Sequence, residues 1–206
     1  MKLKLCGIRR PEDVEMINEA EPDYIGFVFA PTWRQISPET AFELGQGLKN
    51  SIKKVGVFVN EPIDTLLSSA KSAGLDVVQL HGQEDESYIS LVRKGFGGEI
   101  WKAVRVQTPS DVKKAETLSA DMLLYDSFVP GVLGGSGKRL DLNNILNANP
   151  TRPFFLAGGI KAENIDEILY DVTPYGLDIS SAFEVDKRKN RDKLNELMNI
   201  LKGRLQ

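Results

Sequence analysis

Asp126 stands where an apolar run gives way to a segment crowded with glycine. The run Met122–Tyr125 is typical of a buried strand, which would deliver the Asp126 carboxyl group to a strand end, where it could act as a general acid. The segment that follows, 127–140, holds four glycines. Such a segment can close over an anion and offer it backbone N–H groups, or it can be an ordinary surface loop, and both interpretations stay open.

Cysteine and histidine each occur once, as Cys6 and His81. A single cysteine allows neither an intrachain disulfide nor a metal site built from thiolates, so we expect no metal centre. A thiolate at position 6 could instead act as a general base opposite the Asp126 carboxyl group, although a lone cysteine is also commonly a small buried apolar side chain. His81 could orient a substrate or simply pack at a strand end.

Segments rich in Val, Ile, Leu or Phe alternate with segments of helical spacing along the whole chain. Eight are strand candidates: Leu3–Cys6, Tyr24–Phe29, Lys54–Val59, Asp76–Leu80, Ile100–Val106, Asp121–Tyr125, Phe154–Ala157 and Leu177–Ile179. Strand then helix, repeated eight times with strands apolar on both faces, predicts a single domain over residues 1–206. Its class is α/β, a (β/α)8 TIM barrel with parallel strands inside and helices outside. An open doubly wound sheet is the alternative, which eight units in so short a chain disfavour.

Capping residues mark where the predicted helices begin. Ser37 and Thr108 each place a hydroxyl group before a proline at the first helical position, and Asp85 and Asp141 can cap the helices that follow them. Two strand-to-helix loops, 30–37 and 127–140, are long. Long loops in a compact barrel usually serve function.

The active site of such a barrel lies at the carboxyl ends of its strands. The predicted strand ends bring Cys6, His81, Asp126 and Asp178 to this face, and the loop after the second strand adds Arg34. Asp178 could hold a sugar hydroxyl group or cap its own loop.

Small residues after the last two strands predict a phosphate site, because they let backbone amides approach a ligand closely. Plain turn glycines are the alternative. The candidates are Gly158, Gly159, Ser180 and Ser181, with Gly135 and Ser136 from the glycine-rich segment.

Composition narrows the kind of ligand. The chain of 206 residues carries a net charge of −3 and has a pI near 5.4, which argues against nucleic acid as the main partner. The first residues alternate instead of forming the apolar core of a signal peptide, and no stretch reaches membrane-spanning length. We therefore expect a cytoplasmic protein that acts on a small molecule and has neither nucleic acid nor a membrane as partner.

Seven segments, spread over nearly the whole chain, together resemble one enzyme family. They are Lys4–Ile8, Gly26–Pro31 with Arg34, Val55–Asn60, Val78–Gly82, Asp126–Gly131 with the GGSGK run, Leu156–Ile160 and Asp178–Ser181. The pattern is similar to that of phosphoribosylanthranilate isomerase of tryptophan biosynthesis. The Cys-Gly-Ile opening and the Gln-Leu-His-Gly and Asp-Ser motifs are its specific parts, whereas Ala-Gly-Gly is shared by many phosphate-binding barrels.

The resemblance implies an Amadori rearrangement of N-(5-phosphoribosyl)anthranilate to an aminoketose, with Asp126 as general acid and Cys6 as general base. No cofactor is expected, because the iminium nitrogen of the substrate is itself the electron sink. Arg34 would bind the anthranilate carboxylate, since guanidinium binds carboxylates bidentately. A monomer and a homodimer are both compatible with the sequence.

The chain departs from the family after the last strand. Ala182 stands where the family commonly has glycine, and Asp186–Lys189 replaces a Gly-x-Lys-Asp run, which bears on the amides around the phosphate but not on the acid and base. Two other functions stay open: another metal-free sugar-phosphate isomerase or lyase, and a barrel that binds phosphorylated ligands without catalysis. A pure binding module needs neither Cys6 nor Asp126, which disfavours the latter.

Overall fold

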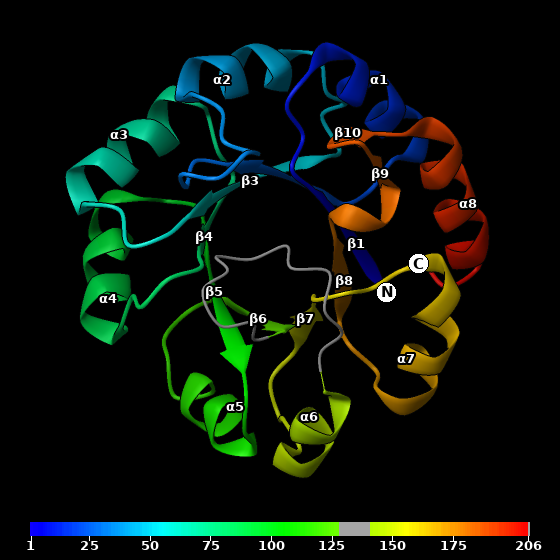
Figure 1. The fold of residues 1–206 in the computed structure, drawn as a ribbon. Helices are drawn as coiled ribbons and strands as arrows, with labels where there is room; N and C mark the ends of the chain where they lie inside the picture. The colour runs from blue at the N-terminus through cyan, green and yellow to red at the C-terminus, as the bar shows by residue number, and fades with distance from the viewer. Residues whose placement is uncertain (128–140, 206) are drawn as a thin grey trace.

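The computed structural model describes residues 1–127 and 141–205, and within them eight parallel strands close into a barrel (Figure 1). Each strand pairs with the next in sequence, and β8 pairs with β1 to complete the ring. The strands are β1 Lys2–Cys6, β2 Tyr24–Val28, β3 Lys53–Phe58, β4 Val77–Leu80, β5 Glu99–Val106, β6 Met122–Ser127, β7 Phe154–Leu156 and β8 Gly176–Ile179. The predicted TIM barrel is confirmed.

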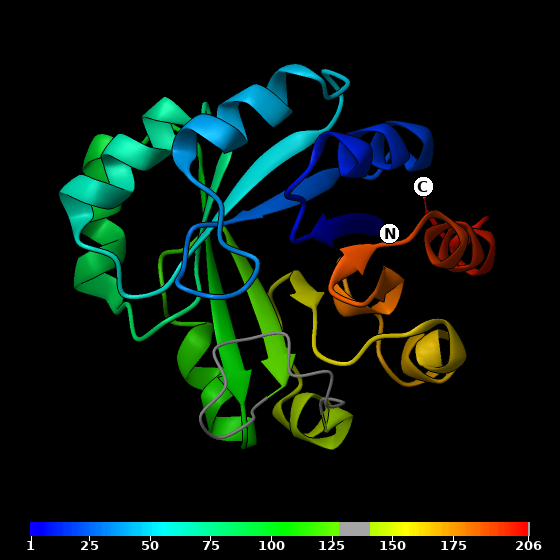
Figure 2. The ribbon, with the colours of Figure 1, turned by 45° about the horizontal axis from the view of Figure 1, so that its top comes forward.

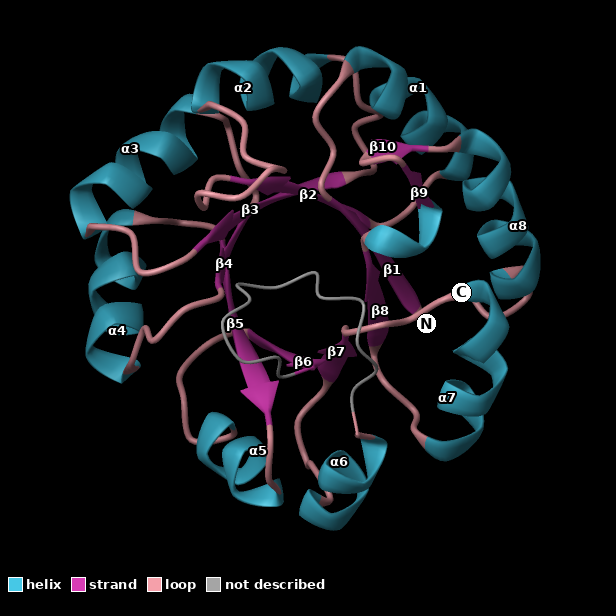
Figure 3. Ribbon diagram, in the orientation of Figure 1, coloured by secondary structure: helices cyan, strands magenta, loops and turns pink. Residues whose placement is uncertain are grey.

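Eight α-helices form the outer ring (Figure 3) in the part of the chain that the structure describes. They are α1 Pro11–Ala20, α2 Pro38–Gln46, α3 Ile63–Ser72, α4 Glu86–Gly95, α5 Pro109–Ala115, α6 Leu142–Ala148, α7 Ile165–Asp171 and α8 Arg191–Leu201. Two 3-10 turns, η1 Ala162–Asn164 and η2 Ser181–Phe183, precede α7 and follow β8. No helix among the described residues combines the length and the apolar character that crossing a bilayer requires.

The core has two parts, because side chains on a strand alternate between its faces. Residues such as Leu3 and Leu5 face the helices and belong to one large buried cluster. Inside the barrel, Tyr24, Trp101 and Phe155 pack together, with the Trp101 and Phe155 ring centroids 4.6 Å apart. Nearer the carboxyl ends the interior side chains are small, as at Cys6, Val28 and Val57, which leaves that end free for polar groups.

Strand β6 extends two residues beyond the predicted end at Tyr125. Asp126 and Ser127 continue the strand because they stay in register with Arg105 and Val106 of the long strand β5. Asp126 therefore lies within a paired strand rather than just after one, which restricts its backbone.

The predicted caps of α2, α4 and α6 are present: Ser37, Asp85 and Asp141 accept hydrogen bonds from backbone N–H groups of the first turn. At α5 the arrangement is different. The Asp111 carboxylate accepts hydrogen bonds from the Thr108 amide (2.8 Å) and from the Thr108 hydroxyl group (3.1 Å). The aspartate therefore provides the acceptor for both donors of Thr108.

A two-stranded hairpin, β9 Glu184–Val185 and β10 Arg188–Lys189, follows the 3-10 turn η2 and lies beside β1 and β8 (Figure 2). Its turn residues Asp186 and Lys187 have φ of 49° and 60°. Two consecutive residues with positive φ match the tight hairpin turn that the twist of paired strands favours. Neither is glycine, so the turn is formed at the cost of backbone strain at Lys187.

Candidate active site

Three of the candidates lie on strand ends, Cys6 on β1, Asp126 on β6 and Asp178 on β8, while His81 follows β4 directly. Cys6, Asp126 and Arg34 are buried. The parallel barrel therefore gathers at one face residues that are up to 172 positions apart in the sequence (178 − 6).

Asp126 is held from both sides. Its Oδ1 accepts a hydrogen bond from the Ser127 amide at 2.7 Å, and its Oδ2 lies 3.1 Å from Nε2 of His81. The amide of Gln79 donates to Nδ1 of His81 (3.1 Å), so Nε2 carries the proton that His81 donates to Asp126. His81 thus orients the Asp126 carboxyl group. This role is more than packing at a strand end, and it is distinct from direct orientation of a substrate.

This environment keeps Asp126 ionised. Burial by itself would raise the pKa of Asp126, but the His81 hydrogen bond, the Ser127 amide and the nearby Arg105 charge outweigh it and place the pKa below its ordinary value. In the role of general acid that the sequence predicts for it, Asp126 would have to gain a proton before it could act.

Gly158 packs directly against Asp126. A Cβ atom at this position would lie 2.8 Å from Asp126 Oδ1 and 2.6 Å from the Ser127 nitrogen, and the glycine has φ of +88°. Only glycine satisfies both conditions. Gly158 therefore shapes the acid side of the site, whatever it contributes to a phosphate group.

Cys6 ends β1 and faces the barrel interior against Gly26, where a Cβ atom would come within 2.5 Å of its sulfur. Beneath it, on the same side of β1, Lys4 is fully buried and its Nζ lies 2.8 Å from Asp178 Oδ2. Burial raises the pKa of the Cys6 thiol, an effect that the positive charge of Lys4 opposes without overcoming.

Asp178 does not cap its loop, and only one of its two carboxylate oxygens is available to a ligand. One carboxylate oxygen binds Lys4, and the other, Oδ1, is buried without a hydrogen-bond partner among the described residues. An unsatisfied buried acceptor is costly, and a ligand hydroxyl group can satisfy it.

The sequence alone does not reveal the partner of Arg34. Its Nε and Nη2 bind the two carboxylate oxygens of Glu184 on β9, at 3.1 and 2.7 Å, and its guanidinium lies 4.1 Å from the Trp33 ring centroid. Glu184 is 150 positions away in the sequence, so no local signal points to it.

Lys189 of β10 joins this group to Cys6. Its Nζ donates to Glu184 Oε1 at 2.9 Å, to the Ser180 carbonyl at 3.0 Å and to the Cys6 carbonyl at 2.5 Å. The Ser180 hydroxyl group also donates to the Cys6 carbonyl. The hairpin after β8 thereby ties together the Arg34 loop, the start of the predicted phosphate loop and the end of β1.

The structure describes only some of the residues predicted to bind phosphate. Gly158 and Gly159 both have positive φ, +88° and +67°, and Ser181 begins the 3-10 turn η2 after β8. Gly135 and Ser136 lie outside the described residues.

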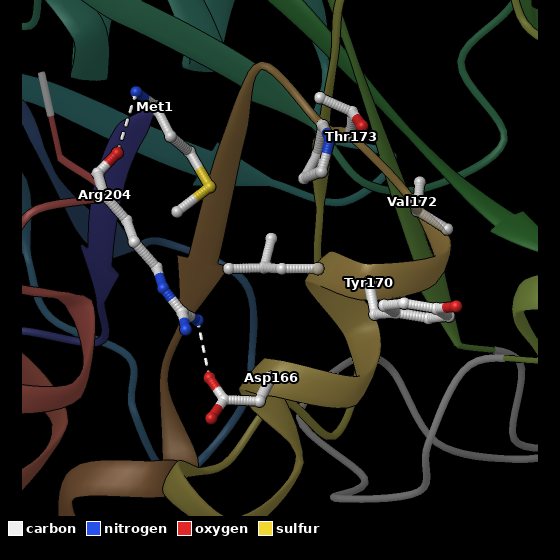
Figure 4. A pocket seen from close by; sticks show the side chains of 8 residues that line it. Met1, Asp166, Tyr170, Val172, Thr173 and Arg204 are labelled. Carbon is white, nitrogen blue, oxygen red and sulfur yellow. Dashed lines mark hydrogen bonds and ion pairs between the residues drawn. The ribbon is translucent and has the colours of Figure 1, made fainter.

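A surface pocket at the amino ends of β1 and β8 is unrelated to these residues (Figure 4). Arg204 crosses it, its carbonyl accepting from the Met1 amino group and its guanidinium binding Asp166. Met1 and Thr173 precede their strands, so the pocket lies at the end of the barrel opposite Cys6 and Asp126. In residues 1–127 and 141–205, no three His, Cys, Asp or Glu side chains are grouped as a metal site would require.

Residues 3–200 match the model of the N-(5′-phosphoribosyl)anthranilate (PRA) isomerase family. The chain is 39% identical over 203 residues to the N-(5′-phosphoribosyl)anthranilate isomerase of Caldanaerobacter subterraneus subsp. tengcongensis, an alignment that covers 98% of each protein. The crystal structure of phosphoribosyl anthranilate isomerase from Thermotoga maritima is similar at a TM-score of 0.88 and 31% identity, covering 98% of this chain and 99% of that one.

A phosphoribosyl anthranilate isomerase in complex with reduced 1-(o-carboxyphenylamino)-1-deoxyribulose 5-phosphate is similar at a TM-score of 0.85 and 30% identity, over 98% of this chain and 99% of that one. Sequence and fold therefore agree over the length of the barrel. This chain belongs to the N-(5′-phosphoribosyl)anthranilate isomerase family.

Proposed function

We propose that this protein is the isomerase of tryptophan biosynthesis that converts N-(5-phosphoribosyl)anthranilate to 1-(2-carboxyphenylamino)-1-deoxyribulose 5-phosphate. The observation that carries the proposal is the placement of a buried carboxyl group on β6 and a buried thiol on β1 at the same barrel face, in a chain of this family. The relative bound to the reduced form of this product supports the same substrate class.

The reaction begins at the sugar ring. Asp126 gives its proton to the ring oxygen, the bond from that oxygen to C1′ breaks, and the nitrogen lone pair forms an iminium with C1′. The positive iminium acidifies the C2′ proton, which the Cys6 thiolate removes. The resulting enolamine becomes the aminoketose when a proton is added at C1′ and the 2′-hydroxyl group loses its proton, so atoms and electrons balance and no redox partner is needed.

The two pKa directions add a requirement to this mechanism. In the free protein Cys6 holds its proton and Asp126 has lost its own, whereas the forward reaction needs the opposite arrangement. The active form is therefore the minor species in which the one proton lies on Asp126, and its share depends on the difference between the two pKa values.

Arg34 and Asp178 are proposed to hold the two organic parts of the substrate. Arg34 binds the anthranilate carboxylate through its Nη1–Nη2 edge, because Glu184 uses only Nε and one donor of Nη2. Asp178 accepts a sugar hydroxyl group at its unpaired Oδ1. The phosphate is proposed to bind the backbone amides of the segments around Gly135–Ser136, Gly158–Gly159 and Ser180–Ser181.

The direct test is to add the protein to freshly generated phosphoribosylanthranilate and follow the loss of anthranilate fluorescence. We expect turnover that needs no added metal or cofactor and that inorganic phosphate slows. A protein that binds the reduced product analogue without turning over the substrate would instead be a binding module. The choice between monomer and homodimer stays a prediction; one similar structure, 32% identical, is of monomers generated from the dimeric isomerase of Thermotoga maritima.

A further inference from the structure

Lys4 is a buried charge whose ion-pair partner in the barrel interior is Asp178. It is fully buried, and the interior side chains around the same level include Val55, Val77 and Leu124. Replacing a buried ion pair with apolar side chains of similar volume is often neutral or stabilising. The ion pair that joins β1 to β8 therefore does not by itself explain why position 4 is a lysine, because an apolar residue could close the barrel as well.

The position of Lys4 relative to the thiol suggests a stronger reason. Lys4 and Cys6 are two residues apart on a strand, so both side chains lie on the same face. Both side chains are buried, and the positive charge of Lys4 acts on the Cys6 thiol, while the Lys4 ammonium group donates to Asp178 Oδ2 at 2.8 Å. Lys4 therefore lies next to the predicted base on the same face of β1 and is bonded to the predicted hydroxyl-binding carboxylate.

After burial, the strongest influences on the Cys6 thiol are the charges of Lys4 on β1, Asp178 on β8, Lys189 on β10 and Arg34 in the loop after β2. The three donors of Lys189 are all used by the oxygens of Cys6, Ser180 and Glu184.

Arg34 shares its charge with Glu184. Lys4 gives one of its three N–H donors to Asp178 and has two left. It is therefore the cation best able to stabilise a negative charge that develops on the Cys6 sulfur.

We propose that Lys4 is a positioning residue for the base, whose ammonium group, anchored by Asp178, donates to Cys6 Sγ and stabilises the thiolate that removes the C2′ proton. The inference rests on the proposed function only in naming Cys6 as the base. The electrostatic effect of Lys4 on the thiol can be measured without any turnover.

The first measurement is the ionisation of the thiol in the full chain. Because Cys6 is the only cysteine, the ultraviolet absorbance of its thiolate is obtained as the difference between each protein and its own Cys6→Ser counterpart across pH. In Lys4→Met we expect the titration midpoint to rise by about one pH unit or more, which lowers the thiolate fraction about tenfold at any pH below the midpoint. Lys4→Arg keeps the charge and should stay close to the unmodified protein.

Lys102→Met is the matched control. Lys102 on β5 is also buried and paired with a carboxylate, Glu84, and its three donors go to Glu84 and to the carbonyls of Leu80 and Gly82. It alternates with the interior residues Trp101 and Ala103, so it faces the helix side of the barrel wall and not the interior that holds Cys6. Its removal should leave the thiol midpoint unchanged. An equal rise in Lys102→Met and Lys4→Met would mean that the effect is a general loosening of the fold, and the proposal would be wrong.

The double variant Lys4→Met/Asp178→Asn covers the case in which the single variant does not fold, since it leaves no unpaired buried charge. The opposing charge of Asp178 acts on Cys6 less strongly than that of Lys4. We therefore expect the thiol midpoint of the double variant still to lie above that of the unmodified protein, and an unchanged midpoint overturns the proposal.

The second measurement is the pH profile of kcat/KM. In Lys4→Met the plateau should fall about tenfold while its alkaline limb moves to higher pH by the same amount as the thiol midpoint, because both follow the thiol pKa. A lower plateau with the alkaline limb in its original place would show a merely structural role. Failure of the proposed function is distinguishable, because the unmodified protein would then not turn over phosphoribosylanthranilate, whatever the thiol titration shows. Turnover retained in Cys6→Ser would mean that Cys6 is not the base.

Discussion

The two sides of the barrel mouth present their reactive groups in opposite ways. On the acid side, Asp126 is surrounded by donors, the His81 imidazole and the Ser127 amide, which stabilise its charged form. On the base side, Cys6 lies among small apolar side chains, and burial favours its neutral form in spite of the nearby cations. In the proposed mechanism, each side therefore stabilises the protonation state opposite to the one that the reaction needs, and the difference between the two pKa values sets the fraction of protein that is ready to react.

Removing either group should have the largest effect. Cys6→Ser and Asp126→Asn should each lower kcat by at least about 10² and up to about 10⁴, the usual contribution of general acid or base catalysis. Binding of the reduced product analogue, measured by calorimetry, should be nearly intact in both. Near-normal turnover in either variant would end the acid and base assignment.

The pH dependence sharpens the contrast between the sides. With the Cys6 pKa raised and the Asp126 pKa lowered, kcat/KM should be level through neutral pH. It should then fall about tenfold per pH unit above the raised thiol pKa, because the single proton is lost there.

At low pH, kcat/KM should begin to fall only below the ordinary pKa of an aspartate. A rate that instead declines between about pH 8 and pH 6 would show that Cys6 reacts as a ready thiolate with a lowered pKa.

Gly158 tests how closely the acid side is packed. Gly158→Ala would combine a strained backbone with a clash against Asp126 and Ser127, so it should lower the free energy of unfolding by about 2–5 kcal/mol and reduce turnover as well. Gly203→Ala is the control, because Gly203 has a similar φ of +86° with no atom near its Cβ position. Chemical denaturation should show a loss of at most about 1–2 kcal/mol for Gly203→Ala, and equal losses would rule out the clash.

Arg34 tests what the base side binds. Arg34→Ala should weaken binding of the reduced product analogue by about 1.5–3 kcal/mol and leave its decarboxylated counterpart unaffected. Arg9→Ala is a matched control, since Arg9 also lies over the Trp33 ring, at 4.9 Å, but has no ion pair with Glu184. Equal losses for the two ligands, measured by calorimetry, would show that Arg34 does not bind the carboxylate.

The smallest expected effect concerns the hairpin that carries Lys189. Lys187→Gly relieves the positive φ of the turn and should raise the free energy of unfolding by about 0.5–1 kcal/mol, after the entropic cost of glycine is subtracted. Lys187→Ala removes the same charge without relieving the backbone and should bring no gain. A gain with alanine as large as with glycine would mean that charge, and not strain, limits this turn.

The sequence by itself determined the barrel and the face that carries the site. Eight apolar segments alternating with amphipathic ones can close in few ways, and a residue at the end of such a segment, as Cys6 is, then has a predictable place. Asp126 was found for the same reason, although pairing with β5 carries its strand two residues further than the apolar run indicates.

Only the tertiary structure decided the surroundings of these residues. The run Lys2-Leu3-Lys4-Leu5 alternates like a half-exposed strand, and alternation alone cannot say that the lysine face of β1 turns into a closed barrel. The partner of Lys4 is 174 positions away on β8, and that of Arg34 is 150 positions away on β9. Such pairs depend on barrel closure and on a hairpin turn that lacks the glycine by which a sequence usually indicates such a turn. These pairs determine which charges act on Cys6.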